Sequence, residues 1–154
     1  MYHYTECGLD NVWLCNGYVE KKTAYGKAVS ISDANELHKL LAEQLLKKPA
    51  RLTGKEFRFL RVQLGLSQSA VAKAQGVTEQ NVSLWERHGK VPKANDQLMR
   101  VMYMLHEAKD QFLREAFNRI MTVERLVHQR ILGETSSKGW STTVENDDRV
   151  SLVA

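Results

Sequence analysis

Hydrophobic residues recur at helical spacing through the middle of the chain, and glycines divide this pattern into short segments. In the first segment, one face of a predicted helix carries Phe57, Leu60 and Leu64. Two more helices are predicted over 68–75 and 78–88, because Gly76 and Gly89 are placed to end them. The pattern therefore predicts a bundle of short helices between residues 52 and 94.

Residues 1–48 have a different pattern. A short apolar run is followed by Asn16-Gly17, a pair that favours a hairpin because both residues tolerate positive φ. Residues 27–31 are a candidate second strand, and Asp33 can cap a helix that follows it. The apolar stripe of that helix consists of Leu37, Leu40, Leu41 and Leu45. This region is predicted to be a small N-terminal α+β unit.

Residues 93–132 contain neither Gly nor Pro, and their apolar residues alternate steps of three and four. These residues are Leu98, Val101, Leu105, Ala108, Phe112, Ala116, Ile120, Val123, Val127 and Ile131. The spacing predicts a long helical segment that either bends back or extends as an arm of a dimer. Up to residue 106 it belongs to the bundle, and 107–132 is a predicted C-terminal helix for dimerisation. Residues 133–154 are rich in Ser, Thr and Asp and are expected to form a flexible tail.

Positive charge is concentrated in the middle third of the chain. Residues 47–100 hold 11 Lys and Arg against 4 Asp and Glu, whereas residues 1–46 hold 4 against 6 and residues 101–154 hold 7 against 8. A concentration of this kind suits a surface that contacts phosphate, although a solvated basic face would have the same composition.

Several classes of protein are not expected. No run of 18 apolar residues is present, so no membrane-spanning helix is predicted. The N-terminus lacks a basic stretch followed by an apolar one, so no secretory signal is expected. Two cysteines, Cys7 and Cys15, do not make a disulfide framework and favour a reducing, cytoplasmic location. Without a Gly-rich phosphate loop or a Ser/His/Asp arrangement, neither enzymatic activity nor a cofactor is expected.

Residues 68–86 meet the spacing requirements of two helices joined by a tight turn. Ala72 is small enough to lie where the helices cross, and Gly76 accepts the positive φ that the turn needs. The residues expected to face the core are Val71, Val77, Val82 and Trp85. This spacing predicts that helix 78–88 crosses helix 68–75 with its polar residues directed outward.

At these positions the sequence resembles a known family. Arg61-Val62-Gln63-Leu64-Gly65-Leu66-Ser67-Gln68, followed by Val82-Ser83-Leu84-Trp85-Glu86, resembles the XRE/Cro class of lambdoid-repressor-type regulators. The resemblance covers residues 52 to about 106. It implies a lambda-repressor-like bundle with a helix-turn-helix, in which Arg61 pairs with Glu86. The expected fold class is mainly α, with this bundle preceded by a small β-hairpin/helix unit and followed by a long helical segment.

The overall layout is also similar to antitoxin regulators of the MqsA type. Those proteins carry an N-terminal zinc module with two Cys-x-x-Cys pairs, whereas this sequence has only Cys7 and Cys15, spaced by seven residues. Four-ligand zinc binding would need His3 and another group at an uncommon spacing, so no bound metal is expected.

The candidate DNA-binding residues lie in the two helices around the turn and just beyond them. They are Gln68, Ser69, Thr78, Glu79, Gln80, Asn81, Ser83, Leu84, Arg87, Lys90 and Lys93. Helix 78–88 is expected to lie in the major groove of double-stranded DNA, with its N-terminal residues nearest the bases. Gln80 can pair with adenine, and Asn81 can do the same or contact phosphate. Glu79 can accept a hydrogen bond from cytosine.

The other candidates are expected to cap a helix or to contact phosphates and a thymine methyl group. Thr78 is a candidate N-cap, and Ser83 and Leu84 can contact phosphate and a thymine methyl group. The start of the helix at Gln68 suits a phosphate, and the resemblance implies that a Gln here contacts DNA. The lysines that follow the third helix, Lys90 and Lys93, can neutralise phosphates.

These expectations favour a dimeric repressor that binds an inverted repeat and controls its own operon, because one short helix reads few bases alone. We expect Phe112 to Ile131 to pack against the same segment of a second copy. An alternative is a type II antitoxin that neutralises a protein toxin through residues 1–48 or the tail. A third is a metal-sensing regulator that uses Cys7, Cys15 and His3.

Overall fold

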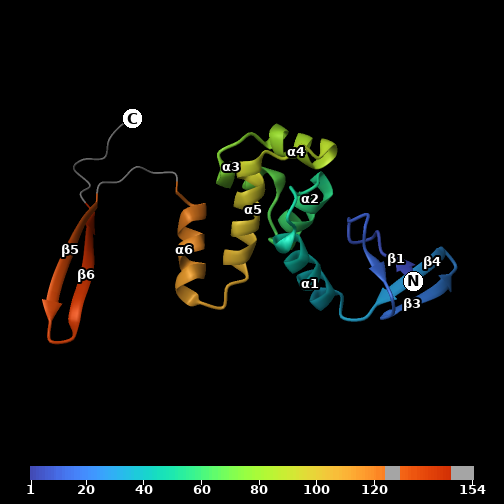
Figure 1. Ribbon diagram of the computed structural model, residues 1–154, viewed down its shortest axis with the longest axis horizontal. Helices are drawn as coiled ribbons and strands as arrows, with labels where there is room; N and C mark the ends of the chain where they lie inside the picture. The colour runs from blue at the N-terminus through green and yellow to red at the C-terminus, as the bar shows by residue number, and fades with distance from the viewer. Residues whose placement is uncertain (124–128, 147–154) are drawn as a thin grey trace. The chain divides into compact units, whose positions relative to one another are not determined.

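The structure, a computed structural model, describes residues 1–123 and 129–146. Within these ranges the chain forms six helices and six short strands in three small sheets (Figure 1). The expectation of a mainly α protein is therefore wrong, because strands precede and follow the helices. The chain divides into two compact units, Met1–Met121 and Thr122–Ala154.

The first unit begins with two small antiparallel sheets. One pairs β1 (Tyr2–His3) with β2 (Trp13–Leu14), and the other pairs β3 (Tyr18–Thr23) with β4 (Gly26–Ile31). The strand predicted over 27–31 is confirmed.

The hairpin predicted at Asn16-Gly17 is wrong. These two residues link strands of different sheets, and the two-residue loop lies between Thr23 and Gly26. A tight turn of the predicted kind needs positive φ at both central residues. Gly17 has a φ of 78°, whereas Asp33 is the only described non-glycine residue with positive φ, so Asn16 does not meet this requirement.

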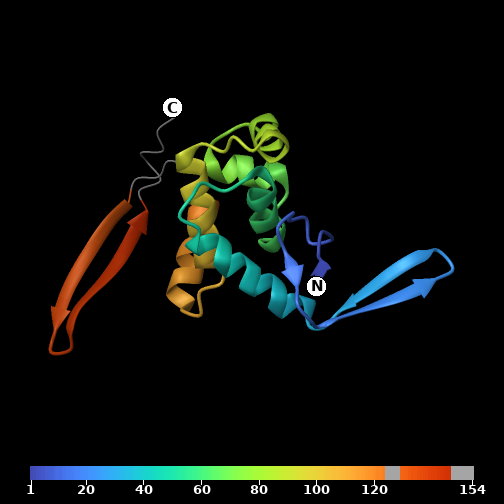
Figure 2. The same ribbon diagram turned by 45° about the vertical axis from the view of Figure 1, so that its right-hand side comes forward.

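The N-terminal strands share a core with the helices that follow. Tyr4, Leu9 and Val12 are buried and belong to the same hydrophobic cluster as the helical residues. The hydroxyl of Tyr4 lies 3.0 Å from Nε2 of His38, whose ring meets the edge of Phe59. Figure 2 shows the chain between β1 and β2 close to the helices. Residues 1–48, which sequence analysis treated as a unit of their own, thus lie in one compact unit with the bundle.

Five helices follow, and side-chain caps mark where most of them begin. Their bounds are α1 (Ala34–Lys47), α2 (Gly54–Gln63), α3 (Gln68–Gln75), α4 (Glu79–His88) and α5 (Lys93–His106). The side chains of the N-cap residues Asp33, Thr53, Ser67 and Thr78 each accept a hydrogen bond from a backbone N–H of the first turn. Positive-φ Gly76 and Gly89 end α3 and α4. The predicted boundaries of these short helices are confirmed.

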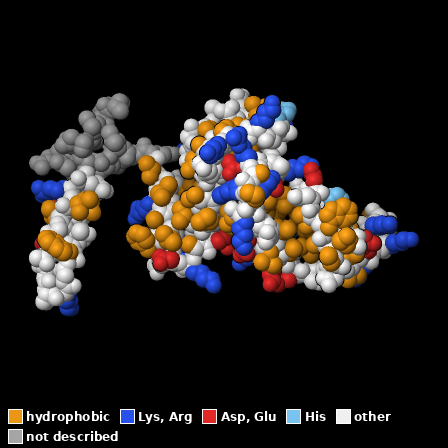
Figure 3. Space-filling model, in the orientation of Figure 1, with side chains coloured by type: hydrophobic (Ala, Val, Ile, Leu, Met, Phe, Trp, Pro, Cys, Tyr) orange, Lys and Arg blue, Asp and Glu red, His pale blue; other side chains and the backbone are white. Residues whose placement is uncertain are grey.

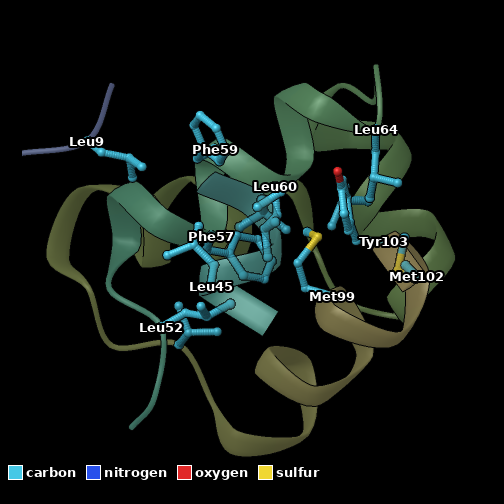
Figure 4. Packing of buried hydrophobic residues seen from close by; sticks show 14 of the residues in the cluster. Leu9, Leu45, Leu52, Phe57, Phe59, Leu60, Leu64, Met99, Met102 and Tyr103 are labelled. Carbon is cyan, nitrogen blue, oxygen red and sulfur yellow. The ribbon is translucent and has the colours of Figure 1, made fainter. Parts of the chain in front are cut away.

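The core of the bundle lies between α2 and α5, and it continues into α1 and the connector before α2 (Figure 4). Phe57 and Leu60, as predicted, are fully buried, together with Leu52 and Met99. Burial of such side chains contributes roughly 1.5–3 kcal/mol each.

Helix α5 buries a different face from the one expected. Leu98 and Val101 are about half exposed, whereas Met99, Met102 and Tyr103 are buried. The rotation follows from polar anchors at the start of the helix. Asp96 Oδ2 accepts the backbone N–H of Leu52 at 2.6 Å, and Asp96 Oδ1 accepts Nε of Arg100 at 2.8 Å. Because Asp96 must face inward to make these bonds, the residues three and six or seven positions later face inward too.

The chain after α5 also differs from its prediction. Helix α6 (Gln111–Met121) follows a break, and the side chain of Asp110 accepts the N–H of Leu113 at its start. The single helix expected over 107–132 is therefore wrong. Its residues 124–128 lie outside the described ones.

The second unit contains a hairpin of β5 (Gln129–Ser136) and β6 (Gly139–Asn146). The flexible tail predicted over 133–154 is thus wrong for residues up to 146, because alternating side chains and a two-residue loop favour paired strands there. Residues 147–154 lie outside the described residues. None of the described helices is both long and apolar enough to cross a bilayer.

Candidate nucleic-acid interface

Helices α3 and α4 cross closely over a small, fully apolar contact. Val71, Ala72 and Val82 are buried where the helices meet, as the spacing of residues 68–86 predicted. Gly76 has a φ of 68°, and the N–H of Val77 donates to the carbonyl of Ala72 at 2.9 Å. Only glycine adopts this conformation without strain, so the turn fixes how α4 leaves α3.

The inner side of α4 is held against α2 by an ion pair. Arg61 Nη2 donates to Glu86 Oε1 at 2.8 Å and Arg61 Nε donates to Glu86 Oε2 at 2.9 Å, so the contact is bidentate. Arg61 Nη1 also donates to the carbonyl of Leu66 at 3.0 Å. The internal pairing of Arg61 with Glu86 is therefore confirmed, and it fixes both α4 and the chain leading into α3.

A close backbone approach completes this anchoring. A Cβ atom at Gly54 would lie 2.5 Å from the carbonyl oxygens of Trp85 and Glu86. The ring of Phe57 meets the indole of Trp85 edge to face, with centroids 5.9 Å apart. Sequence analysis missed Gly54, because nothing in a single sequence marks a glycine needed for close approach when its φ is ordinary.

Helix α3 is tied to α5 by side chains that sequence analysis also missed. Asn95 Nδ2 donates to Gln75 Oε1 at 2.9 Å, and Gln75 Nε2 lies 3.5 Å from Sδ of Met102. Asn95 is buried. The signal available in the sequence for this contact was a polar residue, Asn95, directly before Asp96. Helices α3 and α4 are therefore both held on the sides that face the rest of the bundle.

The outward side of α4 carries most of the predicted site. One shallow depression is lined by Gln68, Glu79, Gln80, Ser83, Leu84 and Arg87. Five of these residues come from α4 and the sixth from the first turn of α3. The structure thus brings together six of the eleven residues proposed from the sequence, on a surface made by both helices.

The remaining five candidates do not line this depression, and Lys93 lines a different one, together with Arg51 and Arg100. Ser69 and Asn81 are exposed in the first turns of α3 and α4. Thr78 caps α4, accepting the N–H of Asn81 at 3.2 Å. Lys90 and Lys93 are exposed beyond the end of α4, and Lys93 begins α5.

The chemistry of this surface is polar, with one basic and one acidic side chain in the depression. Gln80 offers an amide with a donor and an acceptor, and Arg87 offers a planar array of donors. Glu79 is the only acidic residue in the depression. Two helix N-termini, with N–H groups not bonded within the helix, lie at Gln68 and Glu79. An elongated polyanion with hydrogen-bonding edges is complementary to such a surface.

Cys7 and Cys15 are not gathered with other metal-ligating side chains in the part of the chain that the structure describes. Among residues 1–123 and 129–146, no three His, Cys, Asp or Glu side chains gather as a metal site would require. The thiol of Cys7 donates to the carbonyl of Tyr4 at 3.3 Å, and burial raises the pKa of this thiol above its ordinary value. Since a metal binds the thiolate, this setting disfavours ligation by Cys7. That the protein binds no zinc stays a prediction.

No family model, no curated protein and no solved structure matches this chain.

Proposed function

We propose that this protein is a sequence-specific double-stranded DNA-binding transcriptional regulator that reads DNA with α4 of a helix-turn-helix formed by α3 and α4. One observation carries the proposal. The inner sides of both helices are fixed by Gly54, Arg61–Glu86 and Gln75–Asn95, while the polar side of α4 stands exposed and has no structural task. A rigid helix that presents unused polar groups is what readout of base edges requires.

In the proposed complex, the first turn of α4 enters the major groove. Gln80 makes a bidentate contact with adenine, and Glu79 accepts from cytosine where the sequence offers one. Arg87, at the other end of the depression, pairs with guanine or with a phosphate. Lys90 and Lys93 add point charges at the backbone, which raise affinity without selecting sequence.

The two kinds of contact provide the test. Operator fragments are first selected from random DNA with the purified protein, and binding is then measured by fluorescence anisotropy on the selected and a scrambled duplex at several salt concentrations. Gln80→Ala is expected to weaken binding to the selected duplex by roughly 1–3 kcal/mol and to leave the scrambled duplex nearly unchanged.

Lys90→Ala is the matched control. It is expected to weaken binding to both duplexes equally and to reduce the slope of log K against log salt by about one unit. Equal loss on both duplexes for Gln80→Ala would remove α4 as the reading helix. No change for either variant would remove the proposed interface.

The regulator is proposed to act as a dimer on an inverted repeat. Helices α5 and α6 pack together and leave apolar side chains exposed, among them Val101 on α5 and Phe112 and Ile120 on α6. Figure 3 shows hydrophobic side chains on this part of the surface. A second copy that covers them in a two-fold contact would place two α4 helices on one side of the DNA, about 34–36 Å apart.

Light scattering tests this contact. The wild-type protein is expected to have the mass of a dimer at micromolar concentration, and the dimer of Phe112→Asp is expected to dissociate at a higher protein concentration than that of the wild type, with an unchanged circular dichroism spectrum. A monomeric wild-type protein would refute the dimer without refuting binding of a single half-site.

Neutralisation of a protein toxin is a second candidate function, and the exposed aromatic residues of the N-terminal strands favour it. The indole of Trp13 is about half exposed and stacks on His3 with centroids 4.1 Å apart, and Tyr25 is fully exposed at a hairpin tip. Aromatic side chains of this kind are enriched at protein interfaces. Expression of the neighbouring reading frame with and without this chain tests the idea: toxicity that Trp13→Ala no longer suppresses supports it, and the absence of any toxicity contradicts it.

A further inference from the structure

The hairpin of β5 and β6 has two unlike faces. Pairing places Ile131 opposite Val144, Gly133 opposite Thr142 and Thr135 opposite Trp140, so these residues share one face. The three large apolar residues of the hairpin face, Ile131, Trp140 and Val144, are 68%, 78% and 55% exposed. The opposite face carries Arg130 paired with Glu145, and also Glu134 and Ser141, with Leu132, which is partly buried, as its single large apolar residue.

Within the described residues, the hairpin has no core of its own. No described residue of either strand is buried. The best internal packing is the indole of Trp140 over Gly133, where a Cβ would lie 3.7 Å from the ring. A two-stranded hairpin is marginally stable in water, and three or more strands with a hydrophobic face are needed for independent stability.

Among residues 1–123 and 129–146, no strand pairs with the outer edge of β6, and this edge is suited to pairing. The hairpin loop has two residues between Ser136 and Gly139, so this closing pair exchanges both backbone hydrogen bonds. Counting along β6 from Gly139, the peptide groups of Trp140, Thr142 and Val144 therefore point away from β5. Neither β6 nor β5 contains the Pro or Lys that usually blocks an edge.

We propose that the hairpin is a self-association element, in which β6 pairs antiparallel with β6 of a second copy about a two-fold axis at Thr142. The result is a four-stranded sheet in the order β5–β6–β6–β5. This pairing goes beyond the proposed DNA-binding function and does not depend on it. It adds a contact between copies that is separate from the α5–α6 face.

The register follows from the side chains. Antiparallel partners must lie on the same face of the sheet, so the two-fold axis must pass through a residue and not between two residues. With the axis at Thr142, Trp140 stands opposite Val144 of the second copy, and this apolar pair occurs twice. With the axis at Ser141, Trp140 would face Thr142, and with the axis at Thr143 it would face Asn146. An axis at Trp140 or Val144 would set that residue opposite its own copy but would pair only residues 139–141 or 142–146 of β6. The Thr142 register pairs residues 139–145 and brings Trp140 and Val144 together twice.

Charge complementarity supports the same arrangement and the choice of a second copy as occupant. Along β6, Lys138 precedes the strand at the loop and Glu145 lies at the other end. Antiparallel pairing brings the loop end of one copy beside the open end of the other, so Lys138 comes near Glu145 of the second copy, which also pairs with Arg130 of its own hairpin. The six apolar side chains of the hairpin face from the two copies then lie on one face of the sheet, which meets the condition that the single hairpin fails.

Disulfide trapping tests the pairing in the full-length protein. In a Cys7→Ser/Cys15→Ser background, Thr142→Cys places two thiols across the axis, where paired Cα atoms are about 5.5 Å apart and within disulfide range. Thr135→Cys is the matched control, because its two copies lie three strand spacings apart and four residues apart along the strands, about 19 Å. Under mild oxidation, Thr142→Cys is expected to form covalent dimers about tenfold faster than Thr135→Cys.

A second pair of variants distinguishes loss of pairing between the copies from misfolding of the hairpin. Thr142→Pro removes an N–H that faces the free edge, whereas Ser141→Pro removes one that faces β5. We expect Thr142→Pro to keep the strand signal in circular dichroism while abolishing trapping through an added Ser141→Cys/Thr143→Cys pair, which are opposite each other across the copies. Equal trapping of Thr142→Cys and Thr135→Cys, or trapping that survives Thr142→Pro, would overturn the proposal.

Discussion

The helical bundle and the C-terminal hairpin each contain an Arg–Glu pair, and the two pairs differ in everything except their chemistry. In the bundle, the side chains of Arg61 and Glu86 are 12% and 4% exposed, and two donors meet two acceptor oxygens. In the hairpin, Arg130 and Glu145 are 72% and 51% exposed, and both donors reach the same oxygen. The pair in the bundle joins two helices, whereas the pair in the hairpin lies on the surface and is exposed to solvent.

The largest expected difference concerns these two pairs. Glu86→Ala leaves the Arg61 guanidinium buried without its partner and is expected to lower the free energy of unfolding by roughly 3–5 kcal/mol. Glu145→Ala removes an exposed pair and is expected to cost about 1 kcal/mol or less. Urea titration followed by circular dichroism measures both. A loss for Glu145→Ala that equals the loss for Glu86→Ala would show that the hairpin pair is structural too.

An intermediate difference is expected between two glycines. Gly54→Ala would push a methyl group against the carbonyls of Trp85 and Glu86, so it is expected to cost roughly 1–3 kcal/mol. Gly133→Ala meets only the ring of Trp140 at ordinary contact distance and is expected to change stability by less than about 0.5 kcal/mol. Thermal unfolding of both variants checks the comparison. Stability of Gly54→Ala equal to wild type would mean that α2 and α4 can separate without cost.

The smallest difference is expected between two serine hydroxyls. Ser67 Oγ accepts the N–H of Ala70 at 3.0 Å and caps α3, whereas Ser136 Oγ accepts the N–H of Lys138 at 3.2 Å in an exposed loop. Ser67→Ala is expected to cost about 1 kcal/mol, and Ser136→Ala a few tenths at most. Amide hydrogen exchange in α3 should quicken for Ser67→Ala alone. Unchanged exchange there would show that the cap does not limit local opening.

The bundle was predictable because its signals are local. Ser67 and Thr78 lie before helices that they cap, and Gly76 lies where the backbone needs positive φ. Each signal acts within a few residues, so one sequence is enough to read it. The polar face of α4, and with it six of the candidate residues in one depression, followed from the same spacing.

The prediction failed where distant residues decide the structure. The rotation of α5 depends on Asp96 meeting the backbone of Leu52, 44 residues earlier, which no local periodicity reveals. After α5, apolar residues at steps of three and four continue without Gly or Pro, and this pattern favoured one continuous helix. Asp110, which accepts the N–H of Leu113, was a signal in the sequence for the start of a new helix. The strand-forming run from Trp140 to Val144 also indicated β structure, but the Ser and Thr around it favoured a tail instead.

The anchoring of α4 through its inner side has a consequence for how such a protein can change over generations. Folding depends on Gly54, Arg61 and Glu86, and none of these residues lines the exposed depression. They affect it only by holding α4 in place. Substitutions at Gln80, Ser83 or Arg87 therefore carry little folding penalty. Single substitutions can therefore change the chemistry of this surface while the protein stays folded. After gene duplication, one copy could acquire a new binding target through a series of such folded variants.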